Sequence, residues 1–78
     1  MSLVQIDQSL DARGLACPMP IVKTAQLVRQ MTSGQTLEVV ATDPGSIKDF
    51  AAWSRTTGHL LLESSSDGAI YRFVIQKA

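Results

Sequence analysis

The stretch Asp11-Ala12-Arg13-Gly14-Leu15-Ala16-Cys17-Pro18-Met19-Pro20 holds the only cysteine of the chain and two of its three prolines. From Ile21 onward the apolar residues recur at helical spacing, so a loop turns into a helix here. Proline is favoured in the first turn of a helix, and Pro18 is therefore predicted as the first helical residue. Because proline pushes its predecessor towards extended geometry, Cys17 is predicted as the helix cap.

A sulfur at this position is expected to lie at the positive end of the helix dipole, near the free amide of Met19. The pKa of the Cys17 thiol is then expected to fall below its usual value of about 8.5. Arg13 is a candidate contact of the thiolate or of a partner, and Pro18 and Pro20 are candidates for fixing how the sulfur is presented. The alternative is an inert, buried cysteine, which is the commoner condition in small domains.

Length and charge restrict the class of protein. A chain of 78 residues predicts one domain over residues 1–78, and seven basic residues balanced by seven acidic ones argue against a nucleic-acid binder. No apolar run approaches membrane-spanning length and no signal peptide opens the chain, so we expect no membrane partner. One cysteine makes no internal disulfide, which favours a reducing, cytoplasmic location.

Hydrophobic spacing and turn residues predict six elements. Strand and helix patterns alternate along the chain and end in a hairpin with its turn at Asp67-Gly68. Asp43 is predicted as the acidic cap of the second helix, and Ser64-Ser65-Ser66 is predicted as a turn. Gly34 and Gly58 are expected to terminate the helices. The predicted ranges are strand 4–10, helix 18–31, strand 36–41, helix 44–57, strand 60–64 and strand 70–77. The residues expected to face inward are Ile21, Ala25, Val28 and Met31 on the first helix, and Ile47, Phe50, Ala51 and Ser54 on the second. Ser54 is expected to bond back to a carbonyl of its own helix.

This order predicts an α+β two-layer sandwich, βαβαββ, with two helices on one face of a four-stranded mixed sheet. The first three strands are parallel and the fourth is antiparallel. Both helices begin at the carboxyl end of the strands, so Cys17 and Asp43-Pro44 are expected on one rim and His59 on the other. A Cys-His catalytic pair is therefore not expected.

The sequence restricts the reactions in which Cys17 can take part. There is no Cys-x-x-Cys pair for dithiol exchange, and one cysteine with one distant histidine makes no zinc site, so neither metal nor cofactor is expected. A single exposed sulfur suits a protein that carries a persulfide. Such a carrier passes sulfur between other proteins and is not a stand-alone enzyme with its own turnover. Two other hypotheses stay open: an interaction or regulatory module with an unused or redox-sensing thiol, and a redox enzyme working through an intermolecular disulfide.

The pattern Leu10-Asp11-x-x-Gly14-Leu15-x-Cys17-Pro18-x-Pro20 resembles that of the TusA/SirA-type sulfur carrier family, and the likeness covers nearly the whole chain. Weaker matches are Asp43-Pro44 with Asp49, Thr57-Gly58-His59 and Tyr71-Arg72-Phe73. The resemblance implies a sheet in the order 1-2-4-3 and a persulfide on Cys17.

The resemblance also implies partners. The sulfur donor would be a cysteine desulfurase or a rhodanese, and the acceptor a DsrE-like sulfurtransferase. The sulfur would then serve tRNA thiolation, sulfur oxidation or molybdenum-cofactor assembly. Arg13 and Lys23 are candidate partner contacts. Many relatives have a second cysteine where Ser54 stands, so a mechanism that needs two sulfurs in one chain is not expected here.

Overall fold

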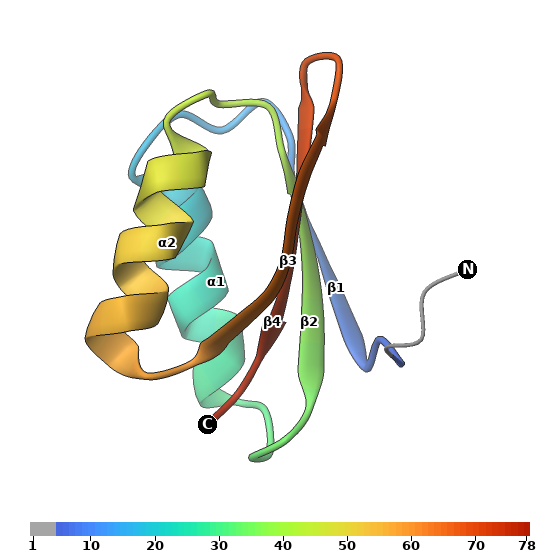
Figure 1. Ribbon diagram of the computed structural model, residues 1–78, viewed down its shortest axis with the longest axis vertical. Coiled ribbons are helices and arrows are strands. Elements are labelled where there is room, and N and C mark those ends of the chain that lie inside the picture. Colours follow the sequence, from blue (N-terminus) through green and yellow to red (C-terminus); the bar gives the residue numbers. More distant parts are fainter. Residues whose placement is uncertain (1–4) are drawn as a thin grey trace.

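The computed structural model describes residues 5–78. Its elements are β1 (Gln8–Ala12), α1 (Met19–Arg29), β2 (Thr36–Ala41), α2 (Ser46–Thr57), β3 (Leu60–Asp67) and β4 (Ile70–Gln76). The strands form one sheet in the order β1-β2-β4-β3, and both helices lie on the same side of it (Figure 1). β1 and β2 are parallel, while β4 runs antiparallel to both β2 and β3. The two-layer sandwich and its strand order are as predicted.

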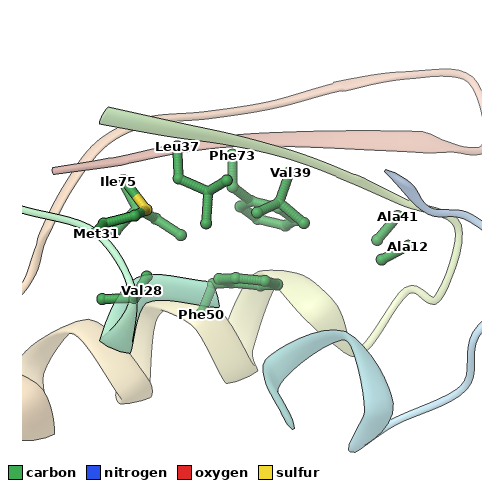
Figure 2. Packing of buried hydrophobic residues seen from close by; sticks show 9 residues of the cluster. All are labelled: Ala12, Val28, Met31, Leu37, Val39, Ala41, Phe50, Phe73 and Ile75. Atoms are coloured by element: carbon green, nitrogen blue, oxygen red, sulfur yellow. The ribbon is translucent and has the colours of Figure 1, made fainter. Parts of the chain in front are cut away.

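The core lies between the sheet and the helices (Figure 2). Leu37, Val39 and Ala41 alternate along β2 and are fully buried on the helix side, as the period of two in a strand requires. Phe50 of α2 stacks on Phe73 of β4 with ring centroids 4.3 Å apart, and both rings are fully buried. These two rings join the helix layer to the centre of the sheet.

The predicted first strand, 4–10, is displaced. Val4 lies outside the described residues, and the observed strand begins at Gln8. Just before the strand, the side chain of Asp7 takes the place of a backbone acceptor, because Asp7 Oδ2 accepts the backbone N–H of Thr36 at 2.9 Å. At its end the pairing continues to Ala12, which lies opposite Ala41.

The third strand is longer than predicted and contains the serines assigned to a turn. The pairing of β3 with β4 shifts between Leu61 and Glu63, so Leu62 is the extra residue of a bulge. Leu61 packs against the core, whereas Leu60 and Leu62 are 53% and 43% exposed, so the burial of the three consecutive leucines alternates although their sequence does not. Beyond the bulge, residues 64–66 continue the ladder into a two-residue turn at Gly68, where φ is +63°.

The inward face of α1 is rotated from the predicted one. Pro20, Thr24 and Val28 are buried, whereas Ile21 and Ala25 are only half-buried. A polar residue, Thr24, thus occupies the centre of the face, and hydrophobic spacing alone does not reveal that.

On α2, Phe50 is inward as predicted, but Ile47 is 45% exposed. Gly58 ends this helix in the left-handed conformation, as predicted, with φ +83°. Ser54 Oγ donates forward to the carbonyl of His59 and not back into its own helix.

The end of α1 also differs. The helix stops at Arg29, and Gly34, with φ +89°, belongs to the turn that leads into β2. Within residues 5–78, neither helix combines the length and the apolar character needed to cross a bilayer.

The Phe50–Phe73 stack yields a stability prediction. Phe50→Ala removes a fully buried ring and is expected to lower the free energy of unfolding by about 3–5 kcal/mol, measured by urea denaturation. Ile47→Ala, one turn earlier in α2, is the matched control and is expected to change it by no more than about 0.5 kcal/mol, because Ile47 is exposed. Equal losses in the two variants would contradict this packing.

Candidate functional site

Cys17 is tied to the start of α2 by two hydrogen bonds. Its backbone N–H donates to Asp43 Oδ2 at 3.1 Å, and its Sγ donates to Asp49 Oδ2 at 2.8 Å. The residue is exposed and its thiol is free. The parallel order of the strands therefore brings Cys17 and the turn after β2 to one rim, as predicted.

The loop between β1 and α1 is fastened along its length. Gly14, with φ +82°, donates its N–H to Thr42 Oγ1 at 2.9 Å, and Leu15 N–H donates to the carbonyl of Ala12. Only glycine adopts such a positive φ without strain. The thiol is therefore exposed on a loop whose backbone is held in place.

The predicted cap is wrong by one residue. α1 begins at Met19 with Pro18 as its N-cap, and Cys17 precedes the cap. The N–H of Met19, expected to face the sulfur, donates to the carbonyl of Ala16 at 2.9 Å. Pro18 and Pro20 have no N–H to offer. Because of the two prolines, the N-terminus of α1 has fewer free backbone N–H groups with which to stabilise an anion.

The predicted direction of the thiol pKa is also wrong. The hydrogen bond to Asp49 raises the pKa of Cys17 above its usual value, since a carboxylate acceptor favours the protonated sulfur. Desolvation raises this pKa further, and so do the negative charges of Asp49 and Asp43. The resting sulfur is therefore a neutral thiol at neutral pH.

Arg13 does not act on the thiol in this structure. Its Nε and Nη2 donate to the two carboxylate oxygens of Asp11, each at 2.9 Å. This pairing lowers the pKa of Asp11 to about 2. The guanidinium is thus held beside β1, and a role for Arg13 with a partner stays a prediction.

The acidic turn after β2 does not cap α2 as predicted, because the N-cap is Gly45. The Asp43 carbonyl accepts the N–H of Ser46, while the carboxylate of Asp43 faces the Cys17 loop. A Cβ at Gly45 would lie 3.3 Å from Asp43 Oδ2 and 3.9 Å from Asp49 Oδ2, so glycine leaves room for both carboxylates. Their place at the start of α2 is favourable for negative charge.

Cys17, Asp43 and Asp49 offer one sulfur and two carboxylate oxygens within 4.8 Å of one another. The two carboxylates are ligand types beyond the cysteine and histidine on which the expectation of no zinc site rested. His59 lies elsewhere, as predicted: its Nδ1 accepts the N–H of Ala78 at 3.0 Å, and its ring lies 5.3 Å from that of Trp53.

Asp49 is the partner of the Cys17 sulfur that the pattern directly around the cysteine did not reveal. It lies 32 positions after Cys17, on a different helix. Two signals were available: Asp49 was among the weaker matches to the family pattern, and both helices begin on the same rim with Asp49 in the first turn of the second.

Comparison with known proteins gives consistent results. The family model described as sulfurtransferase TusA matches residues 8–77. The sulfur carrier protein TusA of Allochromatium vinosum is 47% identical over 76 residues, which cover 97% of this chain and all of that protein. The Bacillus subtilis protein YrkI is 55% identical over 71 residues, covering 91% of this chain and 95% of its own. The crystal structure of a SirA-like protein from Desulfitobacterium hafniense has the same fold, with a TM-score of 0.78, 18% identity and coverage of 88% of this chain and 95% of that one.

The contact between Cys17 and Asp49 yields a prediction on thiol reactivity. Asp49→Asn removes the charged acceptor, so the pKa of Cys17 is expected to fall and alkylation by iodoacetamide at neutral pH to become several-fold faster. Asp67→Asn removes an exposed carboxylate from the β3–β4 hairpin and serves as the matched control, with an unchanged rate expected. An unchanged or slower rate in Asp49→Asn would show that the carboxylate does not hold the proton on sulfur.

Proposed function

Because the chain belongs to the TusA family of sulfurtransferases, we propose that it carries sulfur as a persulfide on Cys17 and hands this sulfur from a donor protein to an acceptor protein. The observation that carries this proposal is the exposed Sγ of Cys17, on a loop fastened to the rim, with a proton acceptor 2.8 Å away. A partner protein reaches such a sulfur without any rearrangement of the core.

Pro18 and Pro20 support the presentation of the sulfur in different ways. Pro18 is the N-cap of α1, and its carbonyl accepts the N–H of Val22, which is where the helical bonds begin. Pro20 is buried and anchors the first turn against the rest of the fold. The rigid helix thus starts directly after the reactive residue, which limits how far the loop moves when a partner docks.

In the loading step, the Cys17 sulfur attacks the terminal sulfur of the donor's persulfide. A new S–S bond forms at Cys17, and the S–S bond of the donor breaks and leaves a donor thiolate. The proton of Cys17 passes to Asp49 Oδ2 as the attack begins and is returned to the departing thiolate. A thiol and a persulfide thereby exchange one sulfur atom, and the step needs no oxidant, reductant or cofactor.

Asp49 has two effects in this scheme. It keeps the free protein in its thiol form, which is less prone to oxidation and alkylation than a thiolate. It also supplies a local acceptor for the proton during transfer. Onward transfer reverses the roles, because a thiolate of the acceptor attacks the terminal sulfur on Cys17.

A sulfur carrier meets both a donor and an acceptor. We propose a cysteine desulfurase or a rhodanese as the donor and a DsrE-like sulfurtransferase as the acceptor, serving tRNA thiolation, sulfur oxidation or molybdenum-cofactor supply. Lys23, exposed on α1, and Arg13 are candidate contacts on this protein's side. We propose cytoplasmic action, since a single thiol stays reduced there.

A second candidate function is favoured by one observation. The raised pKa of Cys17 slows its reactions at neutral pH, which suits an interaction or regulatory module whose thiol is unused or only redox-sensing. Sulfur loading separates the two functions, because the module does not acquire sulfur from a donor.

The loading experiment combines the reduced protein with a cysteine desulfurase and cysteine, and in a second arm with a rhodanese and thiosulfate, followed by intact-mass measurement. At least one arm is expected to add one sulfur atom that a reductant removes. Cys17→Ser is expected to stay folded and to gain nothing, since the hydroxyl forms no persulfide. No gain in either arm, or an equal gain in Cys17→Ser, would reject the carrier function in favour of the module.

A further inference from the structure

A pocket with a volume of about 240 Å³ is lined mainly by residues from the C-terminal halves of α1 and α2. Figure 1 shows these ends of the two helices at the opposite end of the helix layer from the loop between β1 and α1. Ala25 and Val28 of α1 form an apolar side, and Trp53 of α2 provides an aromatic side. Arg29 and Lys77 also line the pocket. Its volume is below the roughly 300–1,000 Å³ typical of sites for drug-sized ligands, so it suits a molecule of about one ring.

Lys77 and Arg29 bring cationic donors to this pocket, and the Thr57 hydroxyl that also lines it already donates to the carbonyl of Trp53 at 2.7 Å. Lys77 is fixed in place, because its backbone pairs with Gly34 and Gln35 and its Nζ donates to the carbonyl of Met31 at 2.6 Å. An ammonium has three N–H groups, so two remain for a ligand. Arg29 is exposed, and among residues 5–78 no carboxylate side chain forms an ion pair with it.

His59 adds a further donor. Its Nδ1 accepts the N–H of Ala78 at 3.0 Å, so the neutral ring carries its proton on Nε2. The ring is tilted by 36° to that of Trp53. The described lining therefore combines two cations and an imidazole donor with an apolar wall, and it includes no carboxylate side chain.

We propose that this pocket binds a small organic carboxylate, with the carboxylate between Arg29 and Lys77 and its planar apolar body against Trp53. A bare inorganic anion would leave the apolar wall unused, and a neutral ring would leave the two cations unpaired. Charge-assisted bonds to a carboxylate are the strong class of hydrogen bond, which favours this ligand over both. The proposal is independent of sulfur transfer, since the lining of the pocket includes neither Cys17 nor its two hydrogen-bond partners Asp43 and Asp49.

The test uses Trp53 as the reporter, because it is the only tryptophan of the chain. The full protein is titrated with sodium benzoate at constant ionic strength, and the intrinsic fluorescence and the amide NMR spectrum are recorded. Benzamide, with the same shape and no charge, is the control ligand. A saturable change is expected, with benzoate bound about tenfold more tightly than benzamide, and with shifts centred on the pocket.

Two variants complete the test. Arg29→Gln is expected to weaken benzoate binding about tenfold, while Lys48→Gln, at the far end of α2, is expected to bind like the unaltered protein. NMR spectra of both variants verify that they are folded. The proposal is overturned if benzoate gives no saturable change, if benzamide binds equally well, or if Arg29→Gln binds as tightly as Lys48→Gln.

Discussion

The site depends on the contact between the loop before α1 and the start of α2, which are far apart in the sequence. Asp43 and Asp49 reach Cys17 over separations of 26 and 32 residues, and they hold its backbone and its sulfur respectively. This meeting follows from the parallel pairing of β1 with β2, because each strand then leads into its helix at the same rim. The sheet and its core matter to function mainly by bringing the ends of β1 and β2 together.

Most of the fold was predictable because its signals are local. The range of β2, Thr36–Ala41, is as predicted, since the stretch is rich in branched residues and alternates weakly. The boundaries of β1 and β3 were not predictable, because both depend on the neighbouring strand. At β1 the Asp7 side chain bonds to the backbone of Thr36, and β3 contains a bulge in its pairing with β4. Leu62 shows this clearly: nothing in the three leucines says which of them is the extra residue.

The exposed sulfur of Cys17 was predictable from the sequence, but the charges around it were not. Cys17 was identified from the glycine loop and the prolines around it, whereas the direction of its pKa shift was predicted wrongly. The start of α1 does not offer a set of free amides, because Pro18 and Pro20 have no N–H and Met19 donates its own to Ala16. The charge that decides the state of the sulfur belongs to Asp49, which only the tertiary structure brings near.

The central claim is that Cys17 rests as a neutral thiol held by a carboxylate. Because the chain has one cysteine, labelling with cysteine carrying ¹³C at Cβ gives a single NMR signal whose shift follows ionisation of the sulfur. Titration of the unaltered protein with base is the most direct measurement. This account predicts a midpoint above the value of about 8.5 found for an ordinary cysteine. A midpoint below that value would contradict it and would restore the helix N-terminus as the dominant influence on the thiol.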